Sequence, residues 1–434
     1  MNRKAVEWLY EQLPELVEKG IIPTESVELI QNHYGQVDKR IGGKTVLTTF
    51  GIIGTLLVGL GIILILAHNW DGMSRMSRTV VAVGMLVVAQ ILAGAVIWFK
   101  KDNIAWTEST STLLMIIIGA SIALIGQTYH LSDHFNTALL SWMLLSLPLV
   151  YLMGVTTPAV LYLVGVTTWA INGEFSNTSQ FSIWILLALV GPYYWKLVKI
   201  DPYGNQPVIL SWVMTFCFYI SFGITFGKYL ESLMVLIYAS LFTLTYFLGI
   251  IWFDEPVKVW QKPFTLIGMT GCVILSFLLT FKDIWWSVGQ EFSSIGSEEY
   301  LLAFSLLALV MLMGMRVVNK KTSQYLLFSA VPVVATAGFM LLYLDVSGMS
   351  ATLLCNAYVL LLSVILIIKG GRQENLGVLN MGMLMVAFLI MMRFFDMDFS
   401  FVARGLVFVL LGSCFLVTNW IMVRRKKEVQ HEKK

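Results

Sequence analysis

Residues 111–129 read S-T-L-L-M-I-I-I-G-A-S-I-A-L-I-G-Q-T-Y, a run without a charged side chain. A helix of about 20 such residues crosses a hydrocarbon core about 30 Å thick. Similar apolar runs recur from Val46 to Val423. The sequence therefore predicts an all-α fold, a polytopic bundle of transmembrane helices.

The composition supports the same class. Of the 434 residues, 57% are hydrophobic and 13% are charged, and the mean hydropathy is +0.78. A soluble domain carries about 25% charged residues. The first 45 residues lack an apolar core segment, so we expect no cleavable signal peptide. The sequence contains no Walker A motif, and its basic residues form no patch typical of nucleic-acid binding.

The four cysteines indicate neither disulfides nor metal sites. All four lie far apart inside apolar runs and without C-x-x-C spacing: Cys217, Cys272, Cys355 and Cys414. We therefore expect small buried side chains.

Apolar patterning predicts about fourteen membrane spans after residue 45. They cover residues 46–67, 79–99, 111–129, 136–153, 156–172, 181–198, 207–226, 232–253, 264–281, 300–317, 323–344, 350–368, 375–394 and 400–423. The polar segment 282–299 holds Trp285 and Trp286, which are suited to lying at the membrane interface.

The predicted organisation has three parts. Residues 1–45 form a small cytosolic helical hairpin and linker, in which residues 1–40 are a possible binding site for a cytosolic protein. Residues 46–423 form the bundle, with 46–153 bearing the polar motifs, 154–374 the generic middle spans and 375–423 the last two spans. Residues 424–434 are a basic cytosolic tail.

Basic residues predict the orientation in the membrane. If both termini are cytoplasmic, only six of the 29 basic residues fall outside: Arg75, Arg78, Lys228, Lys282, Arg393 and Arg404. This asymmetry follows the positive-inside rule. The expected location is the bacterial cytoplasmic (inner) membrane, with multiple spans and both termini inside.

Polar residues gather where the first and third spans end. The third span runs into I-G-Q-T-Y-H-L-S-D-H-F, residues 125–135, and the first ends in A-H-N-W-D, residues 67–71. Both ends are predicted to face outward, as is the junction of the last two spans. We expect these ends to form one polar pocket, made of His68, Asn69, Asp71, Gln127, Tyr129, His130, Asp133, His134, Arg393, Asp396 and Arg404.

Three interpretations of this cluster remain open. If helical, His130, Asp133 and His134 share one face, and with His68 they offer donors for zinc. Alternatively His130 works as a general acid or base oriented by Asp71 or Asp133. The third interpretation is structural, with helix caps and interfacial anchors. No strict metal-ligand motif is present, so the sequence predicts neither a metal nor another cofactor.

Arg404 requires a separate explanation. It lies about one turn inside the last predicted span, where the helix dipole disfavours a cation. An anionic partner would offset this cost, and Asp396 lies on the same predicted side. Arg393 and Asp396 are three residues apart and are also suited to pairing with each other.

The chain resembles a bacterial family of polytopic membrane proteins, domain of unknown function 2157. The resemblance rests on the N-terminal helical pair leading to A-H-N-W-D, on I-G-Q-T-Y-H-L-S, and on a C-terminal pattern beginning R-F-F-D at Arg393 and ending N-W-I-M-V-R-R-K-K at Lys427. It covers the first four spans and the last two. It implies membrane residence and neither a reaction nor a substrate.

Several functions fit this pattern. The number of spans favours a transporter, or a protein that handles a small solute or lipid at the outward pocket. The lack of ionisable residues near the span centres instead favours a membrane enzyme or envelope sensor built on His130, because ion-coupled carriers usually keep such residues. A structural scaffold is the third alternative. The partners that the sequence predicts are the lipid bilayer and a solute or lipid.

Overall fold

The computed structural model describes residues 3–34, 40–69, 72–131, 135–173, 181–227, 230, 233–253, 258–290, 295–319, 327–345 and 347–396, and scattered positions from 402 to 417. The side chains of residues 3–8, 11, 24, 31–34, 40–47, 62–63, 65–69, 319 and 394–396 are not described. The described residues form helices and no strand, which confirms the all-α prediction. The chain divides into two compact units, Met1–Trp169 and Ala170–Lys434.

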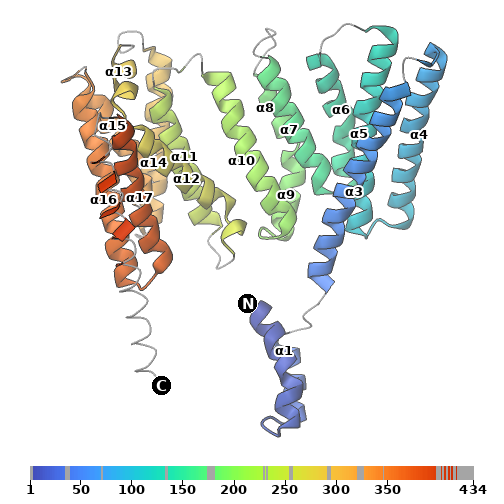
Figure 1. Cartoon of the computed structure of the whole chain (residues 1–434), viewed down its shortest axis with the longest axis horizontal. Coiled ribbons are helices and arrows are strands. Elements are labelled where there is room, and N and C mark those ends of the chain that lie inside the picture. Colours follow the sequence, from blue (N-terminus) through green and yellow to red (C-terminus); the bar gives the residue numbers. More distant parts are fainter. Residues whose placement is uncertain are drawn as a thin grey trace. The chain divides into compact units, whose positions relative to one another are not determined.

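Unit 1 is organised around one helix (Figure 1). Its elements are α1 (Arg3–Glu18), α2 (Thr24–Tyr34), α3 (Arg40–Asn69), α4 (Arg75–Phe99), α5 (Ile104–Tyr129), α6 (Phe135–Met153) and the first part of α7 (Thr156–Gly173). Helix α5 packs against α3, α4 and α6. The close packing of α5 against α6 depends on a glycine: a Cβ added at Gly119 of α5 would clash with the Trp142 ring of α6.

Helices α1 and α2 lie where the sequence predicts two N-terminal helices. Gly20 adopts a φ of +67° in the turn between them, a conformation that glycine tolerates without strain. Their docking as a hairpin and their cytosolic location remain predictions.

Unit 2 is built around α11 (Met234–Trp252), which packs against α12 (Pro263–Leu278), α14 (Ser297–Asn319) and α15 (Val331–Leu341). A second close pair is α16 (Met349–Arg372) with α17 (Leu376–Asp396). The remaining elements are α8 (Ser182–Ala188), α9 (Gly191–Ile200), α10 (Asn205–Phe226), η2 (Val259–Gln261), α13 (Lys282–Gln290) and η5 (Phe328–Ala330). Three cysteines are buried, as predicted: Cys217, Cys272 and Cys355. Cys414 lies outside the described residues.

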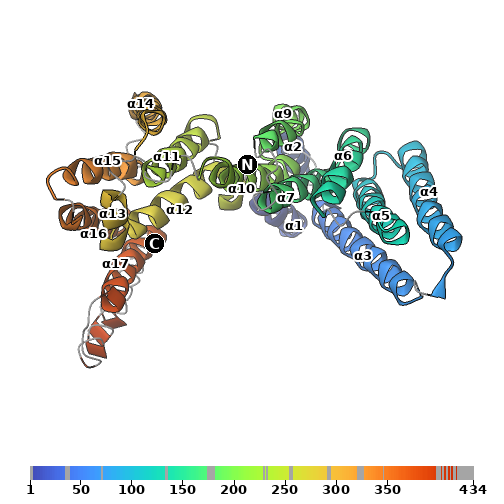
Figure 2. The ribbon, with the colours of Figure 1, turned by 90° about the horizontal axis from the view of Figure 1, so that it is seen from above.

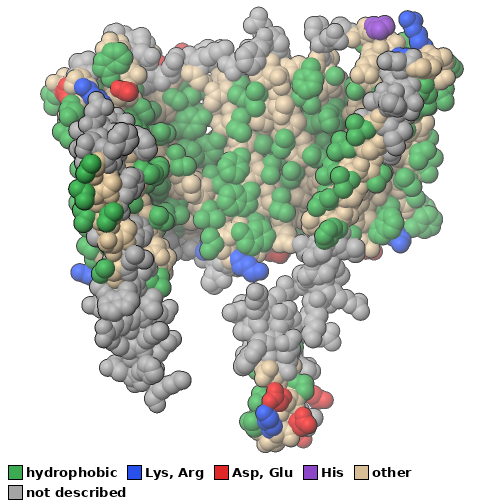
Figure 3. Space-filling view, viewed as in Figure 1, with side chains coloured by type: hydrophobic (Ala, Val, Ile, Leu, Met, Phe, Trp, Pro, Cys, Tyr) green, Lys and Arg blue, Asp and Glu red, His purple; other side chains and the backbone are tan. Residues whose placement is uncertain are grey.

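Nine candidate spans are long and apolar enough to cross a membrane in the described part of the chain, or ten if the bent pair α12–α13 is one span. The predicted count of about fourteen is therefore not confirmed. Two shorter apolar helices fall within the predicted spans 46–67 and 323–344: Thr48–Gly61, which is part of α3, and Phe328–Leu341. Most of 400–423 lies outside the described residues. Figure 3 shows hydrophobic side chains covering the visible helix faces, with Lys and Arg at helix ends.

Candidate functional site

A broken helix marks one end of unit 2. Helix α12 stops at Leu278, and α13 leaves it at an angle of 82°. A 3₁₀-like turn precedes the break, in which the Thr280 N–H donates to Phe277 O at 3.0 Å. Asp283 in the first turn of α13 favours the new helix start, because an acidic group complements the N-terminal dipole. Such a break exposes backbone carbonyls that need partners where water is excluded.

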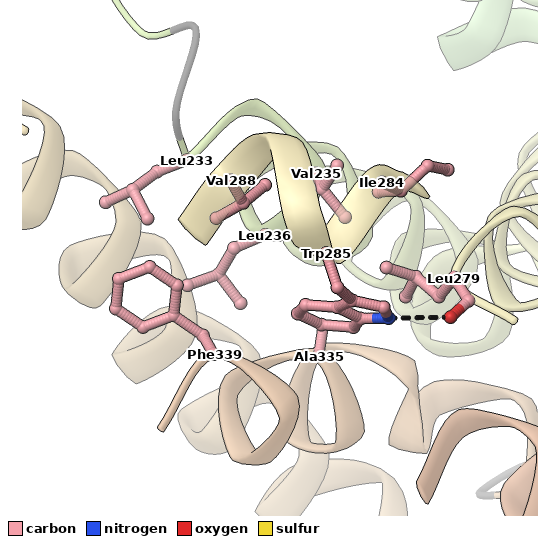
Figure 4. A pocket seen from close by; sticks show the side chains of 9 residues that line it. All are labelled: Leu233, Val235, Leu236, Leu279, Ile284, Trp285, Val288, Ala335 and Phe339. Carbon is pink, nitrogen blue, oxygen red and sulfur yellow. Dashed lines mark hydrogen bonds between the residues drawn. The ribbon is translucent and has the colours of Figure 1, made fainter. Parts of the chain in front are cut away.

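Side chains from other positions satisfy the carbonyls at the break. The Trp285 indole N–H donates to Leu279 O at 2.7 Å (Figure 4). The Asn356 side-chain amide of α16 donates to Thr280 O at 3.1 Å. Asn356 is a polar residue inside the predicted span 350–368, and this contact satisfies its amide N–H.

Arg393 of α17 reaches the same break. Its Nη2 donates to the Thr280 hydroxyl at 3.2 Å, and its guanidinium lies 4.9 Å from the centroid of the Phe281 ring. The cation therefore sits near the C-terminal end of α12, where the helix dipole is negative. Arg393 is half-buried. The break is thus held by residues of α16 and α17 that follow it by more than 70 positions.

Helix α13 closes over a small apolar cavity. Trp285 is only 3% exposed, so its ring packs inside the protein, whereas Trp286 is exposed. Their place at the membrane interface stays a prediction. The cavity has a volume of about 10 Å³, which is room for about one water molecule. Its lining comes from α11, α13, α15 and adjoining turns: Leu233, Val235, Leu236, Leu279, Ile284, Trp285, Val288, Ala335 and Phe339.

Two glycines leave the room that the Trp285 ring and backbone occupy. A Cβ added at Gly338 of α15 would lie 2.5 Å from Trp285 Cη2, and one at Gly348 would lie 2.6 Å from Trp285 Cβ. In Figure 2, α13 accordingly lies beside α15 and α16. The sequence shows tryptophan and glycine here, but their pairing depends on the fold.

The predicted outward cluster of unit 1 is only partly described. The Tyr129 hydroxyl lies 2.9 Å from the Thr79 hydroxyl of α4, which brings the start of α4 to the end of α5. Gln127 is exposed. His130 is exposed and forms the C-cap of α5 in the left-handed conformation, with φ 50° and ψ 42°. Because His130 is not helical, the shared-face argument for His130, Asp133 and His134 does not hold.

The rest of the predicted pocket lies outside the described residues or side chains: His68, Asn69, Asp71, Asp133, His134, Asp396 and Arg404. Arg393 belongs to unit 2, whereas Gln127, Tyr129 and His130 belong to unit 1. The single pocket therefore stays a prediction. Among the described residues, no group of three or more His, Cys, Asp or Glu side chains is placed to hold a metal.

Glu108 is a buried acid that the sequence reasoning missed. It is 4% exposed on α5, and its carboxylate accepts the backbone N–H groups of Thr156 at 2.8 Å and Thr157 at 2.9 Å. These are the first two residues of α7, so Glu108 caps that helix from another helix. The predicted span began at residue 111 and left Glu108 outside. The string T-E-S-T-S-T at 107–112 was the available signal.

Residues 14–159 match the family described as predicted membrane protein (DUF2157). The match contains the N-terminal part of the resemblance drawn from the sequence, while the C-terminal pattern lies beyond it. No curated protein and no solved structure matches the chain. The family match and the apolar helices together identify a multi-pass membrane protein.

Proposed function

We propose that this membrane protein binds a small solute or an amphiphile and moves it across or within the bilayer, with the α12–α13 break as the binding element. One observation carries the proposal: a span is interrupted, two of its carbonyls accept hydrogen bonds from Trp285 and Asn356, and Arg393 donates to the Thr280 hydroxyl. In membrane transport proteins, interrupted helices commonly provide the polar groups that bind substrate or ion.

The chemistry of the break indicates the kind of ligand. Arg393 provides a guanidinium, Thr280 a hydroxyl and Asn356 an amide. Leu279 and Trp285 of the same break line the small apolar cavity. A guanidinium binds carboxylate or phosphate groups in a forked geometry. The proposed ligand is therefore a molecule with one anionic group and an apolar part.

We place the break on the outer side of the bacterial cytoplasmic membrane, with both termini inside. Two sets of contacts are consistent with this orientation. At one end of unit 2, Leu233 N–H donates to Glu299 Oε2 at 3.3 Å, and Arg393 meets Thr280. At the other end, Gln261 donates to Tyr203 O at 2.7 Å. Each pair joins segments that the basic-residue pattern assigns to one membrane side.

The outward pocket of His68, Asp71, Gln127, Tyr129, His130, Asp396 and Arg404 belongs to the same proposal. Within unit 1, its supporting observation is the contact of Tyr129 with Thr79. The left-handed cap at His130 favours a structural role for that backbone. We therefore base the function on the break and not on His130 catalysis.

Uptake by proteoliposomes tests the function. Liposomes containing the purified protein are incubated with the small-molecule fraction of a bacterial extract, washed and analysed by mass spectrometry. We expect at least one carboxylate- or phosphate-bearing compound to accumulate above the level in protein-free liposomes. Equal contents in both preparations, with the protein folded and inserted, would contradict transport.

A further inference from the structure

The turn between α4 and α5 holds a lysine against a tryptophan. Lys100 Nζ lies 4.9 Å from the centroid of the Trp106 ring. The backbone of the turn is fixed at both ends: the Lys100 N–H donates to Val96 O at 2.8 Å, and the Asn103 side chain accepts from the Ala105 N–H at 3.2 Å. The ammonium is therefore presented at a defined place, next to an indole face that favours a cation.

Exposed apolar rings surround this lysine. Trp98 is 83% exposed, and Phe99 and Trp106 are also exposed. Lys101 follows in the same turn, and Asp102 offsets part of the positive charge. Amphipathic rings next to lysines at the end of a spanning helix are typical of residues at the headgroup level of a bilayer.

A second pair of the same kind occurs in unit 2. On α9, Lys199 Nζ lies 5.4 Å from the Trp195 ring centroid, four residues away on the same helix face. Trp195 and Ile200 are exposed, and Lys196 is a further exposed cation. Two separate helix ends thus carry an exposed tryptophan paired with a lysine.

We propose that these Lys–Trp pairs are binding sites for the phosphate of anionic phospholipids. A lysine ammonium has three donors, and stacking on an indole face leaves donors free for phosphate oxygens. The exposed rings would lie against the glycerol and upper acyl carbons of the same lipid. Each lysine near an anionic surface contributes attraction of about 1 kcal/mol.

The surface around the first pair favours a lipid over a protein partner. The exposed face of α4 continues from Trp98 through the apolar side chains of Ile91 and Val87. An occupant of the Lys100 site is therefore continuous with the hydrocarbon that covers this helix. A lipid has this shape, with a headgroup at the turn and chains along the helix.

Native mass spectrometry of the full-length protein in detergent tests the proposal by titration with phosphatidylglycerol or phosphatidylcholine. We expect Lys100→Gln and Lys199→Gln each to weaken phosphatidylglycerol binding about fivefold. Trp106→Leu should weaken it less, because Lys100 keeps its charge but loses its fixed position. Phosphatidylcholine binding should not change in any variant.

Arg75→Gln is the matched control, since Arg75 is an exposed cation at the opposite end of the same helix α4. It should bind phosphatidylglycerol as the wild type does. Equal weakening by Arg75→Gln would mean that only total charge matters, and unchanged binding in both lysine variants would mean that the pairs contact no lipid. Either result would overturn the proposal.

Discussion

The carboxylate of Glu108 accepts the backbone N–H of Thr156 at 2.8 Å, across 48 positions of sequence. This bond joins α5, the central helix of unit 1, to the first turn of α7. The chain between them passes through α6 and turns at Gly154, whose φ is +62°. One buried acid therefore fixes where a later helix starts.

Replacing Glu108 should destabilise unit 1. Glu108→Ala leaves two N–H groups at the start of α7 without their acceptor, which costs about 2–4 kcal/mol. Glu108→Gln keeps an acceptor without the charge and should cost about half as much. Chemical denaturation of the protein in detergent gives the free energy of unfolding. The control is Glu298→Ala at an exposed site, and a similar loss there would refute the capping role.

His130 offers a test that separates a backbone role from a side-chain role. A non-glycine residue in the left-handed region costs about 1–2 kcal/mol per residue. His130→Gly should therefore raise the free energy of unfolding, and uptake should persist. His130→Val should lower stability, because a β-branched residue tolerates this conformation poorly. Abolished uptake in a stable His130→Gly protein would instead indicate that the imidazole itself takes part.

Because Gly338 of α15 packs against Trp285, adding a single methyl group at Gly338 should lower the stability of the protein. Gly338→Ala places a Cβ 2.5 Å from the indole, so the ring or the helix must shift, at a cost of about 1–3 kcal/mol. Gly371→Ala is the matched control, since nothing lies within 4 Å of its added Cβ. It should be neutral or slightly stabilising, because alanine favours a helix. Equal melting temperatures for the two variants would refute the close packing.

Asp345, in the turn before α16, should show a defined pH dependence. Hydrogen bonds from the Ser347 hydroxyl and the Ser350 backbone lower the pKa of Asp345 from 3.8 to about 2. Because the pKa is lower in the folded state, its stabilising contribution is complete above about pH 4 and is lost as the pH falls toward 2. The melting-temperature difference between wild type and Asp345→Asn should thus stay constant from pH 7 to 5 and shrink below 4. A difference that shrinks near pH 6 would point to another group.

Local patterning predicted most helices but not the contacts that define the site. The predicted spans 136–153 and 207–226 agree closely with α6 and α10, because long apolar runs between turn residues leave few alternatives. The sequence predicts span 264–281 and a polar segment after it, but not the angle between them. The 82° turn after Leu278 depends on Asn356, Arg393 and Gly338, which come from later helices, and no local pattern contains that information.

Glu108 illustrates the same limit. Its charge suggested a residue beyond the membrane, and only the position of the α7 start explains why the carboxylate is buried. Asn356, in contrast, lies inside the predicted span 350–368, where an amide is expected to form an interhelical hydrogen bond. The contact with Thr280 O confirms that expectation.

The most direct test of the account compares solute uptake by two arginine variants in proteoliposomes. Arg393→Gln removes the charge at the α12–α13 break, while Arg372→Gln removes an exposed charge at the end of α16. A charge-assisted hydrogen bond is worth about 1.5–3 kcal/mol, so Arg393→Gln should reduce uptake by about tenfold or more. Arg372→Gln should match the wild type. Unchanged uptake in Arg393→Gln, with the variant folded and inserted, would contradict the assignment of the break as the binding element.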